Sequence, residues 1–221
     1  MANNKNELKV IKTADGSFSI YNEFLDETYH SKHGALQESM HVFIKNGLNL
    51  LGIKDISILE VGFGTGLNAA LTYLEAKKNN LKINYTALEP YPLSSEILKD
   101  LAAGYPENIA KQLIEFSKIT DGISRPLTSH FAFTCFLNRV QTFNFIDKYD
   151  LIYFDAFAPE KQNDMWTLEI FIKLFEILKT GGLLSTYCAK GEVKRIMKQA
   201  GFRVKSFPGP PGKREMTVGY K

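Results

Sequence analysis

Apolar and polar positions along the chain alternate between the spacing of buried strands and the spacing of helices. Continuous apolar runs bounded by turn residues predict strands, and apolar positions three and four residues apart predict helices. After a hairpin over 8–21 and a helix over 32–47, we expect strands at 56–61, 83–89, 131–137, 149–157, 183–188, 202–207 and 215–220. We expect further helices at 66–78, 92–102, 107–116, 167–178 and 191–200, and a loop over 117–130.

This order of elements predicts an α/β protein. Strands that alternate with helices form a mostly parallel sheet with helices on both faces. The last two of the seven strands have no helix between them, which predicts an antiparallel hairpin at the edge of the sheet. We therefore divide the chain into an N-terminal extension, 1–50, whose hairpin and helix form a lid, and a Rossmann-like domain, 51–221.

Composition limits the class of protein without indicating an activity. Of the 221 residues, 44% are hydrophobic and 23% are charged, which is ordinary for a globular domain. No apolar run approaches the roughly 20 residues of a membrane span. The first ten residues lack the apolar core of a signal peptide, so we expect a cytoplasmic protein that makes no membrane contact.

Cysteine and histidine residues do not indicate a metal site. The two cysteines, Cys135 and Cys188, lie too far apart in sequence for a metal knuckle. His30, His33 and His41 have metal-like spacing, but no carboxylate or cysteine completes a ligand set. We therefore expect no metal.

Charge is distributed unevenly along the chain. Residues 171–221 contain 11 Lys and Arg against 3 Asp and Glu, a net charge of +8. The first 170 residues contain 16 basic against 21 acidic residues, a net charge of −5. A basic C-terminal quarter suits a polyanionic partner such as nucleic acid, although a solvated surface rich in lysine explains the same charge.

The first predicted strand leads into a loop with three glycines at alternate positions. Residues 59–67 read LEVGFGTGL. Glycine permits positive φ and lets a ligand approach the backbone without meeting Cβ atoms. The loop lacks the Gly-Lys-Ser/Thr ending of a P-loop and is one position short of the dinucleotide pattern G-x-G-x-x-G. The loop therefore predicts a ligand site that is not built for a nucleoside triphosphate.

Two carboxylates beside this loop indicate the ligand. Glu60 precedes the glycines by two residues, where it would repel a pyrophosphate but attract an ammonium or sulfonium group. Glu89 ends the second predicted strand, where an acidic residue accepts hydrogen bonds from ribose hydroxyls. An acidic residue before Gly-x-Gly-x-Gly and a second one at the next strand end are typical of S-adenosylmethionine (SAM) sites. We therefore predict a class I SAM-dependent methyltransferase.

A third carboxylate predicts where the methyl group goes. Asp155 ends an apolar strand, which places it at the same sheet edge as the glycine loop, and Phe157 and Pro159 follow in an apolar turn. A nitrogen nucleophile attacks in its neutral form and becomes cationic as it accepts a methyl group. A carboxylate within hydrogen-bond reach orients the amine, stabilises that charge and takes up the proton. Asp155 is our candidate catalytic residue, although such a residue also caps turns.

Trp166, the single tryptophan, opens the following helix. It is a candidate for stacking on a base, although a lone aromatic residue is more often simply packed.

Several sequence blocks resemble one family. The blocks are LEVGFGTGLN, FDAFAP, MWT, GGLLSTYCAKGEVKR, AGF and GPPGKREM. Together, from about Gly34 to Gly219, they are similar to the methyltransferase family of wobble-uridine maturation in bacterial tRNA. In bifunctional members this domain is fused to an FAD-dependent oxidoreductase, and the present chain resembles the stand-alone form. The resemblance implies SAM-dependent N-methylation of 5-aminomethyl-2-thiouridine at position 34 of the anticodon loop, with a separate FAD-dependent oxidoreductase or another enzyme supplying that intermediate.

The resemblance also implies roles for particular residues. Asp155 would lie beside the target amine. The candidate cofactor ligands are Glu60, Gly62, Phe63, Gly64, Gly66, Asn68 and Glu89, with Asn138 in the region that contacts the adenine. Candidate contacts to the substrate are Phe157, Pro159, Trp166, Lys190, Lys194, Arg195, Lys213 and Arg214.

Two other classes of function fit the same residues. A small-amine methyltransferase or an aminopropyl transferase would accept the three carboxylates unchanged, but would gain nothing from the basic C-terminal quarter. A non-catalytic binding module with this fold would be expected to lack Asp155.

Overall fold

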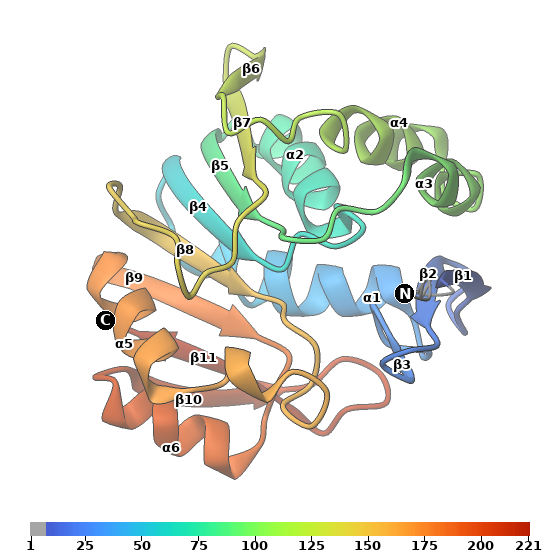
Figure 1. Ribbon diagram of the computed structural model, residues 1–221. Coiled ribbons are helices and arrows are strands. Elements are labelled where there is room, and N and C mark those ends of the chain that lie inside the picture. Colours follow the sequence, from blue (N-terminus) through green and yellow to red (C-terminus); the bar gives the residue numbers. More distant parts are fainter. Residues whose placement is uncertain (1–7) are drawn as a thin grey trace.

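The computed structural model describes residues 8–221 and places them in two sheets with surrounding helices (Figure 1). Residues 1–7 lie outside the described part, as does most of the segment used to predict the absence of a signal peptide. A small antiparallel sheet contains β1 (Leu8–Lys12), β2 (Phe18–Asn22) and β3 (Glu27–Thr28). None of the described helices is long and apolar enough to cross a membrane.

Within the described residues, the larger sheet has eight strands in the order β10-β11-β9-β8-β4-β5-β7-β6. The pairs formed among β9, β8, β4, β5 and β7 are parallel, and the outer pairs are antiparallel. The strands are β4 (Asp55–Val61), β5 (Lys82–Leu88), β6 (Arg125–Thr128), β7 (Phe131–Phe136), β8 (Tyr149–Phe154), β9 (Leu178–Thr186), β10 (Arg203–Pro208) and β11 (Glu215–Tyr220). The predicted α/β fold with a C-terminal antiparallel hairpin is confirmed.

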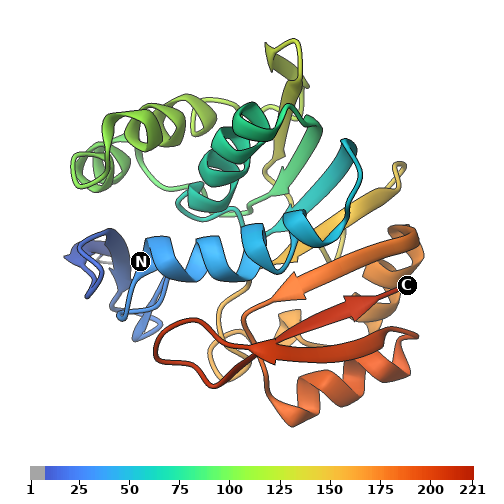
Figure 2. The same ribbon diagram turned by 180° about the vertical axis from the view of Figure 1, so that it is seen from behind.

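Helices cover both faces of this sheet. They are α1 (Ala35–Ser39), which continues as the π-helical segment η1 (Met40–Lys45), α2 (Leu67–Asn79), α3 (Ser95–Ala102), α4 (Glu107–Phe116), α5 (Leu168–Ile177) and α6 (Gly191–Gln199). Two short 3₁₀ turns, η2 (Leu48–Leu50) and η3 (Asn163–Met165), complete the set that the described residues form. Figure 2 shows α1 and η1 crossing one face, and Figure 1 shows α5 and α6 on the other.

Two hydrophobic cores follow from the alternation of side chains along each strand. Successive side chains of a strand point to opposite faces of the sheet. On β4, Ile58 packs with η1, α2 and α4, whereas Leu59 and Val61 pack with α5 and α6. Glu60 therefore shares the face of Ile58 and points toward α2. The same alternation along β8 places Tyr153 in the first core and Phe154 in the second.

Three details of the sequence prediction are corrected. Residues 125–128, predicted as loop, form the short eighth strand β6, which pairs with β7. Residues 179–182, predicted to separate a helix from a strand, belong to β9, which begins directly after α5. Helix α3 begins at Ser95, because the hydroxyl of Ser94 accepts a hydrogen bond from the Ile97 amide and caps it.

The N-terminal region is continuous with the main core. Val42, Phe43 and Ile44 of η1 are fully buried against the sheet, and the Ser185 hydroxyl of β9 donates to the Val42 carbonyl over 2.8 Å. The small sheet lies beside α3 and the start of α1 (Figures 1 and 2). The predicted boundary near residue 50 and the role of residues 1–50 as a lid stay predictions.

Candidate active site

A cavity of about 1390 Å³ opens at the carboxyl ends of the central parallel strands. Its wall is formed by residues 27–32 of the N-terminal region, the glycine loop after β4, the segment after β5, the β7–β8 connection and the loop after β8. Ligands of open α/β sheets bind at this edge. Volumes of about 300–1,000 Å³ are typical for one small-molecule site, so this cavity has room for a cofactor and part of a substrate.

The glycine loop brings bare backbone to the cavity. Gly62, Gly64 and Gly66 have φ of 88°, 52° and 81°, a region that residues with a Cβ atom rarely adopt. A Cβ on Gly62 would lie 2.5 Å from the Asp155 carbonyl oxygen, and one on Gly66 would lie 2.8 Å from the Phe63 ring. The loop therefore requires glycine at these positions, and it leaves Gly62, Phe63 and Gly64 lining the cavity while Gly66 begins α2.

Glu89 lies at the end of β5 and faces the same cavity. Its two carboxylate oxygens accept hydrogen bonds of 2.8 Å from the amides of Gly64 and Tyr91. Burial raises the pKa of Glu89, and these two hydrogen bonds act in the opposite direction. Each oxygen keeps a second lone pair, so this fixed carboxylate can accept hydroxyl hydrogens from a bound ribose. Glu89 thus lies at the sheet edge where it is expected, and its contact with a cofactor stays a prediction.

Glu60 is placed differently from the prediction. It has no exposed surface, does not line the cavity, and accepts hydrogen bonds from the Asn68 amide over 2.9 Å and from the Tyr85 hydroxyl over 2.8 Å. Both of its oxygens are thus directed into the core, because the alternation along β4 turns residue 60 toward α2. Loss of hydration raises the pKa of Glu60 well above its ordinary value. A direct contact between Glu60 and the cofactor is therefore not supported, and Glu60 reaches the site through Asn68.

Asn68 joins this buried carboxylate to Asp155. Its side-chain nitrogen also donates to the Asp155 carboxylate over 2.8 Å, so one amide bridges the two acids. Asn68 lies in the first turn of α2, is buried, and its own Oδ1 has no hydrogen-bond partner among the described residues. The bridge fixes the direction in which Asp155 presents its carboxylate. Asn68 itself does not line the cavity.

Asp155 follows β8 and lines the cavity. Its backbone amide donates to the Val61 carbonyl over 2.9 Å, which holds the loop after β8 against the glycine loop. The pKa of Asp155 is raised to about 7, chiefly by burial and then by the negative charge of Glu38, while the Asn68 hydrogen bond and Lys213 act in the opposite direction. A carboxylate whose pKa lies near neutrality can hold or release a proton under ordinary conditions.

The N-terminal region contributes side chains that sequence reasoning did not assign. Tyr29 lines the cavity and packs edge-on against Phe157, with ring centroids 5.0 Å apart. His30 is buried and its Nε2 lies 2.8 Å from the Thr65 hydroxyl of the glycine loop, and burial lowers the pKa of His30 to about 4. These contacts hold residues 29 and 30 beside the glycine loop, and the role of the N-terminal region as a lid stays a prediction.

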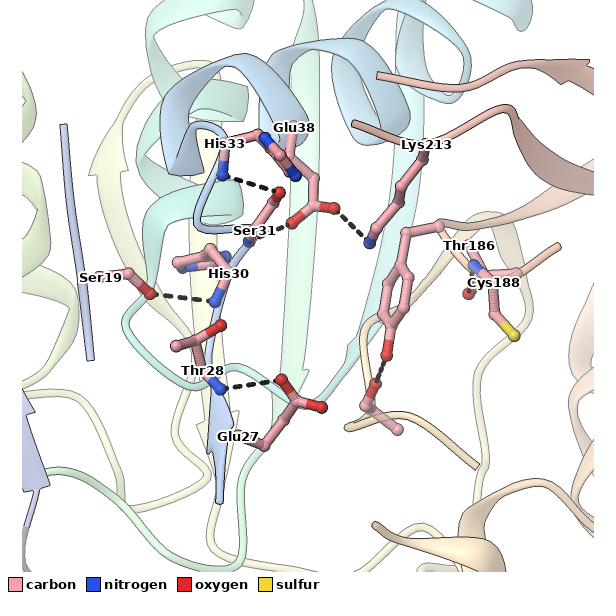
Figure 3. Close-up of polar contacts among 12 residues, drawn as sticks. Ser19, Glu27, Thr28, His30, Ser31, His33, Glu38, Thr186, Cys188 and Lys213 are labelled. Carbon is pink, nitrogen blue, oxygen red and sulfur yellow. Dashed lines mark hydrogen bonds and ion pairs between the residues drawn. The ribbon is translucent and has the colours of Figure 1, made fainter. Parts of the chain in front are cut away.

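Glu38 and Lys213 meet at the cavity wall. Figure 3 shows Glu38 between Ser31 and Lys213, with a dashed contact to each. The Ser31 amide donates to one oxygen over 2.8 Å and the Lys213 ammonium donates to the other over 2.5 Å. Lys213, predicted to contact tRNA phosphate, instead lines the cavity as the partner of a carboxylate. No local pattern indicates Glu38, because its partner lies 175 positions away.

The aromatic candidates divide between the cavity and the core. Phe157 lines the cavity, and its carbonyl accepts a 2.8 Å hydrogen bond from the Trp166 indole. Trp166 is 4% exposed and packs against Phe154 with ring centroids 5.0 Å apart, so stacking of Trp166 on a base is ruled out by its burial. Its position fixes the loop that carries Phe157. Pro159 lies in that loop, outside the cavity wall.

Two other predicted basic contacts are occupied by neighbouring acids. Lys190 is paired with Glu160, and Lys194 donates to Glu215 over 2.6 Å and to the Ser206 hydroxyl over 2.7 Å. Neither lysine lines the cavity. These contacts partly neutralise two of the basic side chains of the C-terminal quarter. Arg195 and Arg214 are exposed and lie outside the cavity wall.

The region predicted to contact the adenine lines the cavity after β7, the strand that pairs with the β5 strand before Glu89. Asn138 is exposed there, beside Arg139. The guanidinium of Arg139 donates to the Tyr91 hydroxyl and lies 5.3 Å from the centre of its ring. Tyr91 and Arg139 both line the cavity and were not assigned from sequence. Tyr91 lies two residues after Glu89, the carboxylate at the end of β5. This position beside a predicted site residue is the one feature of the sequence that could have indicated a place for Tyr91 in the cavity wall.

The cavity wall as a whole is acidic. Seven aspartate and glutamate residues line it against four lysine and arginine residues. Such a wall raises the local concentration of cations and disfavours phosphate. Within the described residues no group of three His, Cys, Asp or Glu side chains could hold a metal ion.

Comparison with known proteins assigns the class and then the family. The fold with the glycine loop and acidic strand ends is that of a class I SAM-dependent methyltransferase. A profile of the family described as S-adenosyl-L-methionine-dependent methyltransferase matches residues 94–221, and the chain belongs to this family. The protein is therefore a SAM-dependent methyltransferase, and the predicted cofactor class is confirmed.

Individual relatives are consistent with this assignment. The chain is 32% identical over 215 residues to the tRNA 5-methylaminomethyl-2-thiouridine biosynthesis bifunctional protein MnmC of Marinomonas sp. (strain MWYL1), covering 90% of this chain and 32% of that protein. It is 31% identical over 212 residues to the protein of the same name from Leptospira interrogans, covering 89% and 33%. The chain thus spans about a third of the length of these curated relatives.

Solved structures show the same architecture. The crystal structure of MNMC2 from Aquifex aeolicus superposes with a TM-score of 0.79 at 25% identity, covering 99% of this chain and 72% of that one. Spermidine synthase from Thermotoga maritima shares the fold, with a TM-score of 0.56 at 12% identity and coverage of 96% and 67%. The predicted relationship to the MnmC methyltransferases is confirmed.

Proposed function

We propose that this methyltransferase transfers the methyl group of SAM to the aminomethyl nitrogen of 5-aminomethyl-2-thiouridine at position 34 of tRNA. The product is 5-methylaminomethyl-2-thiouridine. The observation that carries the proposal is Asp155, a carboxylate held by Asn68 at the wall of an acidic cavity beside the glycine loop. The name of the curated relatives supports the choice of this nucleoside.

The residues at the glycine loop fit SAM. Gly62 and Gly64 line the cavity with bare backbone, beside which the methionine and ribose parts of SAM would lie, and the Glu89 carboxylate would accept the ribose hydroxyls. Phe63 packs beneath the loop, and Asn138 and Tyr91 line the part of the cavity where an adenine would lie. SAM supplies an activated methyl group: as the N–CH₃ bond forms, the S–CH₃ bond breaks and its electron pair neutralises the sulfonium.

Asp155 prepares the nucleophile. The target amine enters as an ammonium ion, which the acidic wall attracts. Asp155 accepts one proton from that ammonium, so the nitrogen lone pair becomes free to attack. Because Asn68 holds one oxygen of Asp155, the other oxygen would be available to the amine. After transfer, the carboxyl returns its proton to solvent and the methylated amine leaves.

The shape of the site suits a base taken out of its stack. A recessed cavity of about 1390 Å³ accepts an extruded nucleoside together with the cofactor. Bases of an anticodon loop are single-stranded, so extrusion costs little. The exposed residues Arg195 and Arg214 of the basic C-terminal quarter are proposed to meet the RNA backbone outside the cavity. A separate FAD-dependent oxidoreductase or another enzyme would supply the aminomethyl form.

One experiment separates this function from transfer to a small amine, which an acidic cavity would also attract. The protein is incubated with methyl-labelled SAM and three acceptors in turn: tRNA with the aminomethyl group, the same tRNA without it, and a polyamine. Label in the first acceptor alone supports the proposal. Label in the polyamine alone would refute it. An aminopropyl transferase is tested separately with decarboxylated SAM, which the proposal predicts is not a substrate.

A further inference from the structure

A residue from the N-terminal part of the chain and one from the C-terminal part form an ion pair at the wall of the cavity. Glu38 of α1 is 6% exposed, and its carboxylate is held by the Ser31 amide at 2.8 Å and the Lys213 ammonium at 2.5 Å. Lys213 precedes β11, and its ammonium also lies 3.9 Å from the centre of the Tyr187 ring. All four residues line the cavity (Figure 3 shows Ser31, Glu38 and Lys213). The pair is thus part of the site itself.

The loop that carries Lys213 is fastened to the N-terminal region at two further points. Gly212 has a φ of 83°, and a Cβ there would lie 2.1 Å from the His33 ring, so the approach requires glycine. His41 Nε2 lies 2.7 Å from the Pro208 carbonyl oxygen at the start of the same loop. These contacts fix the position of Lys213 against α1, so the ion pair is part of a built contact between the two segments.

This contact is linked to Asp155 through Tyr187. The Tyr187 hydroxyl donates to the Ala156 carbonyl over 2.9 Å, directly after Asp155 in the chain, while Lys213 covers its ring. Titratable groups from several elements act on the charge of Asp155. Glu38 and Lys213 act in opposite directions, and the remaining titratable neighbours are Glu60 on β4, Tyr85 on β5 and Tyr187 after β9.

We propose that the Glu38–Lys213 pair is a positioning device for the methyl transfer: it closes the amine end of the cavity and balances the charge that surrounds Asp155. The proposal rests on the proposed function, in which Asp155 takes a proton from the target amine. With both partners present, the positive charge of Lys213 offsets part of the effect of Glu38 on Asp155. Loss of Lys213 leaves Glu38 as an uncompensated negative charge, and loss of Glu38 leaves a positive one.

The two losses have opposite signs. A neighbouring negative charge disfavours ionisation of a carboxyl, so Lys213→Gln raises the pKa of Asp155. A neighbouring positive charge favours ionisation, so Glu38→Gln lowers it. Each change is expected to be about one pH unit. In the double variant the two effects oppose each other, so the pKa of Asp155 is expected to lie between those of the single variants, near the wild-type value, although the ion pair is gone.

Two readouts test this in parallel. The pKa of Asp155 is measured by ¹³C NMR on protein labelled at the aspartate carboxyl carbons, with Asp155→Asn to assign its signal. The pH profile of methyl transfer to aminomethyl tRNA is recorded for the same variants. Both are expected to move upward in Lys213→Gln, downward in Glu38→Gln and little in the double variant. Lys82→Gln removes an exposed lysine paired with Asp55 at 2.7 Å and serves as the control, with no movement expected.

The outcomes distinguish the two proposals. An unchanged pKa of Asp155 in both single variants, or a change of the same sign in both, overturns the role of the pair. Lys213→Arg keeps the charge and is expected to restore the wild-type profile, which covers the case of a single variant that fails to fold. If wild-type protein transfers no methyl to the tRNA while the NMR changes occur as stated, the proposed substrate fails and the electrostatic coupling stands.

Discussion

Asp155 is a residue whose chemistry follows from poor solvation. Asp155 follows the end of β8 at the cavity wall, and its carboxylate accepts a hydrogen bond from the side-chain amide of Asn68. Burial raises its pKa from an ordinary value of 3.8 to about 7. A carboxylate with that pKa is a far better acceptor for the proton of an alkylammonium ion than an ordinary aspartate.

Replacing Asp155 by Asn tests this role. The amide keeps the size of the side chain but cannot accept the proton, so the rate of methyl transfer is expected to fall by about 10²- to 10⁴-fold. SAM affinity, measured by calorimetry, is expected to stay near wild type. Wild-type transfer should rise as pH increases through about 7, and this rise should be absent from the variant. Parallel loss of SAM binding would contradict the assignment.

The same residue affects stability. Because the folded pKa of Asp155 lies above the unfolded value, folded protein binds more protons between pH 3.8 and about 7. The free energy of unfolding that Asp155 contributes therefore decreases as pH rises through that window. Asp155→Asn removes this pH-dependent contribution. The thermal stability of the variant relative to that of the wild type should therefore increase from pH 5 to pH 8. A relative stability that is independent of pH would contradict the raised pKa.

Glu89 is the residue on which we expect cofactor affinity to depend most directly. Glu89→Gln removes one acceptor oxygen and its charge, and a hydrogen bond to a charged group contributes about 1.5–3 kcal/mol. The dissociation constant for SAM is therefore expected to rise about 10- to 100-fold, with a smaller change in the rate at saturating SAM. Glu96→Gln changes another carboxylate of the cavity wall and is the control. Equal effects of the two variants would contradict a specific role for Glu89.

Among the elements, the glycine loop is the one whose geometry is most constrained. Gly62 and Gly16 share a positive φ, 88° and 85°, but a Cβ at Gly62 meets the Asp155 carbonyl at 2.5 Å whereas one at Gly16 meets nothing within 4 Å. Gly16→Ala should cost about 1–2 kcal/mol in the free energy of unfolding, from the backbone conformation alone. Gly62→Ala should cost more and abolish SAM binding. Urea unfolding measures both, and equal costs would contradict the close approach.

Elements that depend on local pattern were predictable. The apolar runs of β4, β5 and β8 and the glycines after β4 carry their own signals, and they bring Glu89 and Asp155 to one sheet edge. The direct passage of α5 into β9 was not predictable, because a pair of glycines is typical of a turn between elements. Here Gly181 and Gly182 are part of β9, whose register with β8 is irregular. Local pattern describes one segment at a time and does not report its partner.

Side-chain roles that depend on distant partners were not predictable. The basic local sequence of Lys213 predicts a contact with RNA, but a carboxylate 175 positions away determines its place. Trp166 is a candidate for base stacking by its position in the sequence, and the core formed with Phe154 and Phe171 buries it. Glu60 points away from the cavity because side chains alternate along β4 and residue 60 faces α2. In each case tertiary packing, which a single sequence does not state, decided the outcome.

At the scale of the whole molecule, opposite charges are separated in space. The cavity wall is acidic, whereas exposed arginine and lysine residues of the C-terminal quarter, among them Arg195 and Lys198, lie outside it. This separation suits a substrate with an anionic backbone and one cationic group. The basic surface would hold the RNA, and the cavity would select the ammonium.

The separation predicts a salt effect. Replacing Arg195 and Lys198 by Gln should weaken tRNA binding and reduce the slope of log affinity against log salt by about 0.7–0.9 for each phosphate that the protein no longer neutralises. Lys77 and Lys78, exposed at the end of α2, are the matched control pair, and their replacement should leave the slope unchanged. Binding is measured by fluorescence anisotropy over a range of salt concentrations. The same slope in both double variants would remove α6 from the interface.

The most direct test of the central claim is to identify the nucleoside that receives the methyl group. Purified protein is incubated with methyl-labelled SAM and tRNA from cells that accumulate the 5-aminomethyl form, and the RNA is then digested to nucleosides and separated. The account predicts label in 5-methylaminomethyl-2-thiouridine with wild-type protein and almost none with Asp155→Asn. Label in another nucleoside, or no label although SAM binding is demonstrated separately, would contradict it.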